Sequence, residues 1–219
     1  MSKESKIQKE IEAFKGLAGA IAREARSAMI SINDCYSIAK DNLEEIKKFM
    51  NHAESCTKRN LSIIDMLLLN LHEEEIDPKG FANLSIAKMV DTAIKEYGFE
   101  DENQKSLVTV NIENDFKFKG DETLMIYVIF NLLRNALYYK ANINIWTGGK
   151  GSRQLYFKDD GPVLPLEQQR SIFNTYYNPS RHDSNSFGLL FCSRVIEAFG
   201  GKISCNSIGG KYTVFILEF

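Results

Sequence analysis

A chain of 219 residues with 44% hydrophobic and 26% charged residues has the composition of a globular protein, and its length allows one large domain or two smaller ones. The net charge of -2 gives no electrostatic attraction toward nucleic acid, and no apolar run reaches the roughly 20 residues that a membrane span needs. We therefore expect a cytoplasmic chain with no nucleic-acid partner, attached to a membrane only through segments that precede it. The four cysteines have no zinc-ligand spacing, which predicts reduced thiols rather than a metal site.

The first third of the chain predicts long amphipathic helices. Apolar residues recur at steps of three and four over residues 4–75, which contain no proline. The polar stretch Lys40-Asp41-Asn42 predicts a break, with Asn42 capping a second helix. The apolar strip at residues 63–69 is too wide for one partner helix, so two hairpins are expected to pair into a dimeric four-helix bundle. The alternative is a monomeric helical region that folds around the neighbouring domain.

Residues 79–219 have a different predicted secondary structure, in which helices and strands are interspersed. A domain boundary is expected at Pro78, because proline and glycine follow the helical region there. The domains are therefore predicted as residues 1–78, a helical dimerisation hairpin, and residues 79–219, a mixed-sheet α/β sandwich. Helices are expected at residues 85–97, 121–139, 166–173 and 187–199, and strands at residues 107–112, 143–146, 154–158, 202–206 and 212–218.

Three short motifs in the second domain suggest a ligand. Asn131 and Asn135 share one face of an apolar helix, where their amides either bind a ligand or are two satisfied buried asparagines. Asp159 ends a strand and is followed by Gly161, a pattern that by itself is an acidic turn. Gly188 lies where a polar loop meets a helix, and free N–H groups at such a junction suit phosphate.

In this order and spacing, the three motifs resemble the N, G1 and G2 boxes of the GHKL ATPase superfamily, and specifically of its sensor histidine kinases. Residues 172–177 resemble the F box, and residues 194–203 resemble the helix and strand after the G2 box. The resemblance extends from about Phe14 to Phe219. It implies an α+β architecture, in which a dimeric four-helix bundle precedes a GHKL ATPase sandwich. Residues 135–139 and 202–207 further resemble the α-hydroxyketone quorum-sensing kinases.

The resemblance implies ATP and Mg²⁺ as cofactors and assigns roles to individual residues. Asn135 would be the Mg²⁺ ligand, Asn131 a neighbour on the phosphate side, and Asp159 the acceptor for the adenine amino group. A carboxylate there discriminates against guanine, which presents a carbonyl at the same place. Residues 174–187 would form the ATP lid. The nucleotide-binding set implied by the resemblance is Asn131, Asn135, Tyr138, Asp159, Gly161, Gly188, Leu189 and Thr213.

The nucleotide motifs also depart from the family pattern. Val163 stands at the second glycine position of the G1 box, and Ser184 and Ser186 stand at the first two of the G2 box. Each replacement adds a side chain and restricts the backbone, so weakened nucleotide binding is expected. Tyr138 stands where many members have lysine, and Lys140 or Arg134 could compensate.

The largest departure lies in the first helix. The family pattern there begins with the phosphoacceptor histidine, whose position is occupied by Arg23. A guanidinium stays protonated and cannot replace an imidazole nucleophile. Glu24 matches the family's general base, and Ser27 matches a position that orients water when such proteins dephosphorylate a partner. Arg23 is either natural or introduced, and the sequence is compatible with both.

Two classes of function follow. The first is the core of a two-component sensor histidine kinase at the cytoplasmic face of the inner membrane. It would be a homodimer that transfers phosphate to the receiver domain of a response regulator, with autophosphorylation lost because of Arg23. The second is a phosphorelay scaffold or phosphatase that binds the response regulator and has a degenerate ATPase domain. A GHKL serine kinase acting on an anti-sigma partner is a third interpretation, and the long helical hairpin argues against it.

Overall fold

The computed structural model describes residues 43–71, 76–162, 185–208 and 211–219, together with residues 26, 29, 30, 169, 172 and 173. The first predicted helix and the residues that join it to the second lie outside these ranges, apart from three single positions. The second predicted helix is α2, described over Leu43–Leu71. Asn42, its predicted cap, lies outside the described residues. None of the described helices is both long and apolar enough to cross a membrane.

The second domain is built on a five-stranded mixed sheet, as predicted. Its strand order is β2-β4-β5-β7-β6, in which β2 and β4 are parallel and all other neighbours are antiparallel. The last two strands, β6 and β7, pair antiparallel, and residues 209–210 between them lie outside the described ranges. The strands are β2 (Val108–Asn111), β4 (Ile143–Thr147), β5 (Gln154–Asp159), β6 (Lys202–Ile208) and β7 (Tyr212–Glu218).

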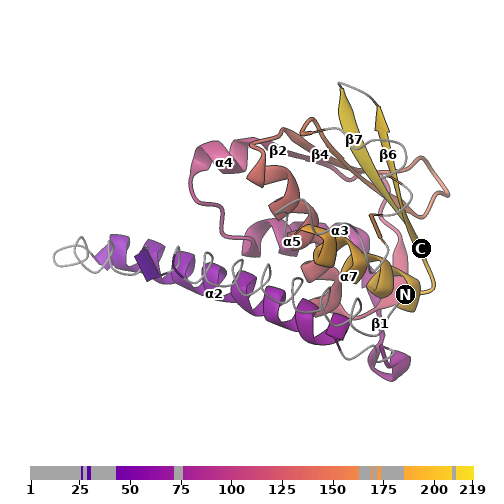
Figure 1. Cartoon of the computed structure of the whole chain (residues 1–219), viewed down its shortest axis with the longest axis horizontal. Helices are drawn as coiled ribbons and strands as arrows, with labels where there is room; N and C mark the ends of the chain where they lie inside the picture. The colour runs from indigo at the N-terminus through magenta and orange to yellow at the C-terminus, as the bar shows by residue number, and fades with distance from the viewer. Residues whose placement is uncertain are drawn as a thin grey trace, which may run out of the picture.

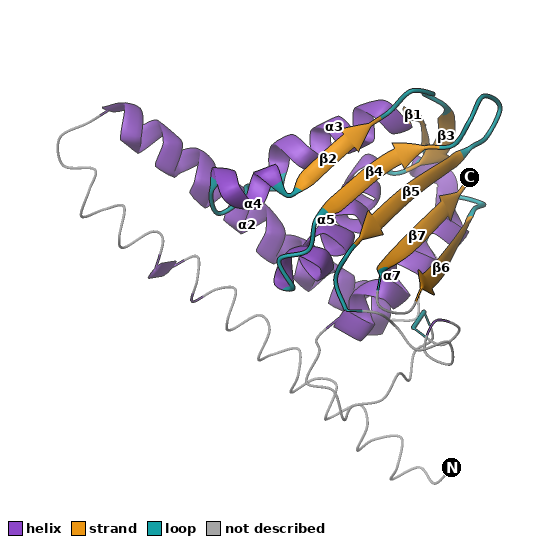
Figure 2. Cartoon of the chain, turned by 90° about the horizontal axis from the view of Figure 1, so that it is seen from above, coloured by secondary structure: helices purple, strands orange, loops and turns teal. Residues whose placement is uncertain are grey.

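Three helices cover one face of this sheet: α3 (Ile86–Glu96), α5 (Glu122–Tyr138) and α7 (Asn185–Ala198) (Figure 2). Strands β5 and β7 alternate between buried and half-buried side chains, so one face of each contributes to the core and the other faces away from the helices. The most apolar helix, α5, is buried on most of its surface and begins at Asp121, whose carboxylate accepts the N–H of Leu124 at 2.9 Å. The core therefore lies between the sheet and these helices.

Four short elements were not predicted from the sequence. Strands β1 (Ala82–Ser85) and β3 (Lys117–Gly120) form a separate antiparallel pair, while α4 (Glu102–Ser106) and the 3₁₀ turn η1 (Pro78–Gly80) are each about one turn long. Segments of three to five residues are too short to show a hydrophobic period. The predicted helix at residues 166–173 falls mostly outside the described ranges, and the domain boundary at Pro78 stays a prediction.

Helix α2 packs against the sheet-bearing domain along its C-terminal half, while its N-terminal half extends beyond that domain (Figure 1). Ile63 and Met66 are buried in this contact, with 5% and 4% exposure. Arg59 donates to the carbonyls of Tyr97 and Gly98 at the end of α3, and its guanidinium lies 5.2 Å from the centroid of the Tyr97 ring. The contact therefore combines a small apolar patch with hydrogen bonds to a helix end.

Further toward its C-terminal end, α2 contacts the two helices that carry the predicted nucleotide-binding residues. The hydroxyl of Tyr127 on α5 donates to Asp65 at 3.2 Å, and Arg194 on α7 donates to the carbonyl of Leu69. A shallow hollow of about 390 Å³ lies beside the first of these contacts, between Asp65 and the start of α5.

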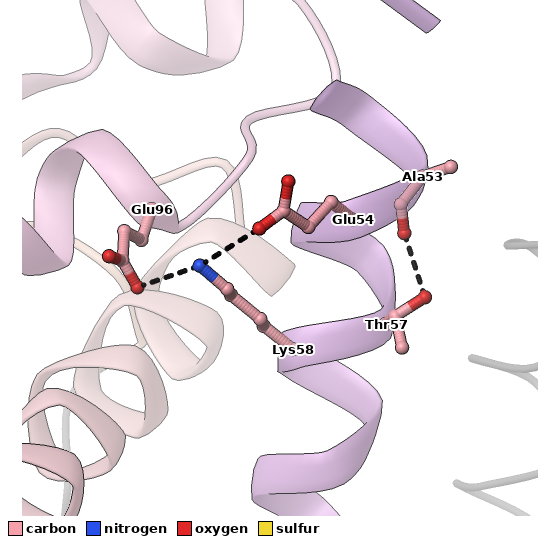
Figure 3. Close-up of polar contacts among 5 residues, drawn as sticks. All are labelled: Ala53, Glu54, Thr57, Lys58 and Glu96. Atoms are coloured by element: carbon pink, nitrogen blue, oxygen red, sulfur yellow. Dashed lines mark hydrogen bonds and ion pairs between the residues drawn. The ribbon is translucent and has the colours of Figure 1, made fainter. Parts of the chain in front are cut away.

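An ion-pair cluster on the surface completes the contact. The Nζ atom of Lys58 lies 3.3 Å from Oε1 of Glu54 and 3.2 Å from Oε2 of Glu96, which joins α2 to α3 (Figure 3). These hydrogen bonds raise the pKa of Lys58, chiefly the one to Glu96, while partial burial opposes the shift. All three side chains are more than a third exposed, so each ion pair contributes about 1 kcal/mol or less.

The buried part of the apolar strip bears on the predicted homodimer. Ile63 and Met66 are covered by the chain's own second domain, which is the alternative arrangement that the sequence left open. Leu61 and Ile64 remain 49% and 38% exposed. Among the side chains that the structure describes on this part of α2, these two leave apolar surface for a partner. The dimeric four-helix bundle stays a prediction.

Candidate nucleotide-binding site

The first part of the site is a cluster of polar residues at one end of the sheet, on the face that packs against the helices. Asp159, the last residue of β5, lies beside Thr213 of β7, and the two are 8% and 2% exposed. The amide of Gly161 donates to Oδ1 of Asp159 at 3.0 Å, and the Thr213 hydroxyl lies 2.9 Å from Oγ of Ser207. A Cβ added to Gly161 would lie 2.9 Å from Oδ1 of Asp159, so glycine is needed for this close approach. The structure thus brings together Asp159, Gly161 and Thr213, three of the residues in the expected nucleotide-binding set.

Burial controls the charge of this group. Desolvation raises the pKa of Asp159 to about 6. The hydrogen bond from Gly161 opposes the shift, and the nearby charge of Asp160 adds to it. The same environment raises the pKa of Cys205 to about 12, through burial and then the charge of Asp159. At neutral pH, Asp159 is therefore an ionised acceptor beside neutral donors.

The second part of the site is Asn131, whose side chain is almost fully buried between α5 and α7. Its Nδ2 atom donates to Sγ of Cys192 at 3.4 Å, and its Oδ1 atom accepts from Arg134. A Cβ added to Gly188 would lie 2.0 Å from this Oδ1 atom, so Gly188 is required for the contact between the two helices. Asn131 therefore has internal partners on both sides of its amide.

Asn135, one turn further along α5, is different. Its Oδ1 atom is buried, and no hydrogen-bond donor among the described residues reaches it. A buried carbonyl oxygen without a donor is destabilising unless a ligand satisfies it. Amide oxygens are suitable ligands for Mg²⁺, which usually keeps several waters and bridges to phosphate. Asn135 thus fits the predicted role of a Mg²⁺ ligand. The described residues contain no cluster of three or more acidic, histidine or cysteine side chains that could hold a metal by themselves.

The two parts are joined through the end of α5. Asn142, shortly after the helix, donates to Asp160 through its backbone N–H at 2.6 Å and its side-chain amide at 2.8 Å. A Cβ at Gly161 would lie 3.5 Å from the Cβ of Ala141 in the same connection. Asp159 therefore lies next to the connection that follows the C-terminal end of α5, the helix that carries Asn135 and Asn131.

The remaining predicted residues are placed as follows. Tyr138 is 71% exposed and contacts the Tyr139 ring edge-on, with the ring centroids 5.0 Å apart. Leu189 is buried, so its side chain contributes to packing. Ser186 lies in the first turn of α7 rather than in the loop, which shortens the predicted lid. Arg23, Glu24, Ser27, Val163 and Ser184 lie outside the described ranges.

Sequence reasoning missed the residues that support the site. Cys192 holds Asn131, and Gln169 pairs with the backbone of Ser207 through both its amide atoms, at 3.0 and 3.1 Å. Ile172 is buried, and the Phe173 ring contacts Phe215 on β7, so the start of the predicted F box packs against the sheet. The spacing of Gly188 and Cys192, one helical turn apart, was a usable signal that Cys192 faces the same way.

Comparison with known proteins agrees with this geometry. Residues 120–219 match the family described as histidine kinase-, DNA gyrase B- and HSP90-like ATPases. The chain is 31% identical over 233 residues to the autoinducer 1 sensor kinase/phosphatase LuxN of Vibrio campbellii, a match that covers 98% of this chain and 27% of that protein. It is 29% identical over 188 residues to the CAI-1 autoinducer sensor kinase/phosphatase CqsS of Vibrio cholerae, covering 84% of this chain and 27% of that protein. The chain thus spans about a quarter of the length of these relatives.

Solved structures share the fold. The catalytic domain of histidine kinase ThkA superposes with a TM-score of 0.53 at 23% identity, covering 64% of this chain and 94% of that one. Full-length ShkA in complex with AMPPNP gives a TM-score of 0.56 at 15% identity, covering 93% of this chain and 45% of that one. At these identities the structures establish the fold alone. The sequence matches show that the chain is a homologue of sensor histidine kinases, with residues 120–219 matching the histidine kinase-, DNA gyrase B- and HSP90-like ATPase family.

Proposed function

We propose that this chain binds ATP with Mg²⁺ and forms the cytoplasmic core of a two-component sensor histidine kinase. The observation that carries the proposal is the buried Oδ1 atom of Asn135, which has no donor among the described residues and lies on the helix whose end adjoins Asp159. One end of the site thus offers a carboxylate to a base, and the other offers an amide oxygen to a metal.

Each residue has a distinct role in this proposal. Asp159 accepts a hydrogen bond from the adenine amino group, and the close approach of Gly161 leaves the strand end open to a flat ring. Thr213 lies beside Asp159 and supplies a hydroxyl on the base side. Asn135 binds Mg²⁺, which neutralises phosphate charge when it is bound.

For the parent protein, we propose phosphotransfer to the receiver domain of a response regulator, at the cytoplasmic face of the inner membrane. The exposed residues Leu61 and Ile64 support a homodimer through the helical region. Autophosphorylation of this chain is lost, because Arg23 offers no nucleophilic nitrogen at the acceptor position.

Arg23 also favours a second candidate, a receiver-binding scaffold or phosphatase. Ser27 occupies the position that orients water for dephosphorylation, and that role does not need a histidine. LuxN and CqsS are each named as a sensor kinase/phosphatase, which makes loss of only one activity a coherent outcome.

ATP binding is tested by calorimetry with and without Mg²⁺. We expect weak, Mg²⁺-dependent binding that Asp159→Ala abolishes, because a carboxylate then no longer faces the base. Asn135→Ala should reduce the affinity and remove most of its dependence on Mg²⁺. Matched controls are Asp91→Ala and Asn103→Ala, which change exposed residues on α3 and α4. Binding that neither site variant alters would show that the nucleotide lies elsewhere.

A phosphorylation assay separates the two candidate functions. The chain should take no acid-labile label from γ-labelled ATP, and Arg23→His should restore it, because Glu24 and Ser27 remain within about one helical turn of the new imidazole. If Arg23→His takes no label although ATP binds, the scaffold or phosphatase function is favoured. Label on the unaltered chain would mean that another residue accepts phosphate.

A further inference from the structure

The amide of Asn131 is enclosed by two successive turns of α7. Gly188 and Cys192 lie four residues apart and therefore on one face of that helix. The backbone at Gly188 approaches the amide so closely that an added Cβ would overlap its oxygen, carbon and nitrogen atoms. From the next turn, Sγ of Cys192 accepts a hydrogen bond from Nδ2 of Asn131 at 3.4 Å. The space beside this amide is therefore filled by protein.

Cys192 makes a second bond to α5. Its thiol donates to the carbonyl of Val128 at 3.9 Å, about one turn before Asn131 on the same helix. Cys192 has no exposed surface, and Asn131 is 1% exposed. Burial raises the pKa of Cys192 to about 12, so the thiol keeps the proton that it donates. One side chain of α7 thus bonds two residues of α5, which fixes the two helices relative to each other.

Asn135 has a different environment, although it lies on the same face of α5 as Asn131. It is four residues further along, about 6 Å along the helix axis. Its buried Oδ1 atom has no hydrogen-bond donor among the described residues, whereas the amide of Asn131 bonds to protein through both its polar atoms. Because the start of α7 is held at Asn131, its position relative to Asn135 depends on that contact.

We propose that Asn131 is a positioning residue that contacts no part of the nucleotide. It holds the first turn of α7 beside the Mg²⁺ ligand Asn135, and Cys192 is the partner through which it acts. This inference rests on the ATP binding proposed above, and it differs from the resemblance, which places Asn131 on the phosphate side of the ligand. ATP affinity then depends on a thiol that the ligand does not touch.

The first test asks whether Asn131 acts through Cys192. Calorimetry with ATP and Mg²⁺ compares Asn131→Ala, Cys192→Ala and the double variant, each shown to be folded by thermal unfolding. Each single change should weaken binding by about 3- to 10-fold, the affinity equivalent of one hydrogen bond, and the double variant should be no weaker than either. Cys192→Ser keeps both a donor and an acceptor and should bind nearly as the unaltered chain does. Asn103→Ala, an exposed change on α4, should have no effect.

The second test separates the two asparagines by their dependence on Mg²⁺. Asn131→Ala should weaken ATP binding by the same factor with and without Mg²⁺, whereas Asn135→Ala should bring the two affinities close together. Without nucleotide, the order of the effects on stability reverses. Asn131→Ala should lower the Tm, because it breaks the contact with α7. Asn135→Ala removes a buried oxygen that has no donor and should change the Tm little.

Thiol labelling of the free chain follows the helix contact directly. The thiolate is the reactive form of cysteine, so Cys192 should label slowly in the unaltered chain. Asn131→Ala should increase its labelling rate several-fold and leave that of Cys205 on β6 unchanged, with each site read by mass spectrometry of its peptide. Asn135→Ala should alter neither rate.

Four results would each overturn the inference. Losses of ATP affinity that add fully in the double variant would mean that Asn131 contacts the ligand without help from Cys192, and a loss confined to Mg²⁺ would assign it to the metal. Unchanged ATP affinity in Asn131→Ala would remove its role in binding, and unchanged labelling of Cys192 would mean that it does not hold α7. All four leave the proposed nucleotide site standing. If the unaltered chain binds no ATP, the proposed function fails and this inference fails with it.

Discussion

The contact between α2 and the second domain differs in kind from the core of that domain. The core between the sheet and its helices is apolar and closed: Leu133, Ile143 and Leu217 have no exposed surface. The α2 contact buries few apolar side chains and otherwise depends on Arg59, Lys58 and other polar groups at its margin. Burial of apolar area contributes far more stability than exposed ion pairs. From this difference we expect the core to contribute most of the stability, and α2 to detach at a smaller cost in free energy than unfolding the sheet.

The largest expected effect tests the core. Leu217→Ala on β7 should lower the free energy of unfolding by about 2–5 kcal/mol, because the side chain is fully buried and its removal leaves a cavity. Its neighbour Ile216 lies on the opposite face of the sheet and is only half-buried. Ile216→Ala should therefore have an effect of about 1 kcal/mol, measured by urea unfolding under the same conditions. Equal losses would mean that the second face of the sheet is also covered.

The second prediction concerns the one carboxylate on the core face of β5. Burial raises the pKa of Asp159 from its ordinary value of 3.8 to about 6, so ionising it disfavours the folded state. The penalty is absent well below the unfolded pKa of 3.8, where folded and unfolded chains are both protonated, and complete above the folded pKa of about 6, where both are ionised. Relative to Asp159→Asn, the chain should therefore lose about 3 kcal/mol of stability between about pH 3 and about pH 7. Urea unfolding of both proteins across this range checks the difference, and parallel curves would contradict it.

The third prediction addresses α2. Gly98 follows the end of α3 with a φ of +64°, and a Cβ there would lie 2.0 Å from the Cβ of Ser55 on α2. Gly98→Ala should cost about 1–3 kcal/mol, because it combines backbone strain with displacement of α2. Hydrogen exchange should increase along the C-terminal half of α2 and change little in the core of the sheet.

Ser55→Gly provides the matched control for this change, because it removes the atom that the new methyl group would meet. The double variant should recover the steric part of the loss and retain the strain at residue 98, giving a measurable coupling energy. Strictly additive effects would mean that α2 does not pack against Gly98 in solution.

The sequence predicted the elements of the main sheet but not their order. The apolar pattern of α5 and the alternation in β5 and β7 were strong enough to place the main helix and the last strands, and Asp121 marked the start of α5. The pair β1–β3 was missed because each strand has four residues and is defined by its partner, which lies 32 to 38 positions away in the chain.

For the site, the sequence indicated which residues meet but not what each one does. Asn131 and Asn135 have the same spacing signal, and only the contact with Cys192, 61 positions from Asn131, shows that one amide is satisfied internally. Likewise, the apolar strip on α2 predicted a partner without saying which one, because α7 of the same chain, more than 110 positions away, packs against α2.

A side chain on the outer face of the sheet can distinguish global unfolding from nucleotide binding and from detachment of α2. Trp146 is the chain's single tryptophan, and its ring stacks on that of Tyr156 on the next strand, with centroids 5.0 Å apart and planes inclined by 5°. Both side chains alternate away from the core face that carries Asp159. Tryptophan emission in this protein therefore reports the pairing of β4 with β5, and it should remain steady when a nucleotide binds or α2 detaches. A natural fluorophore thus distinguishes global unfolding from both local events without any label.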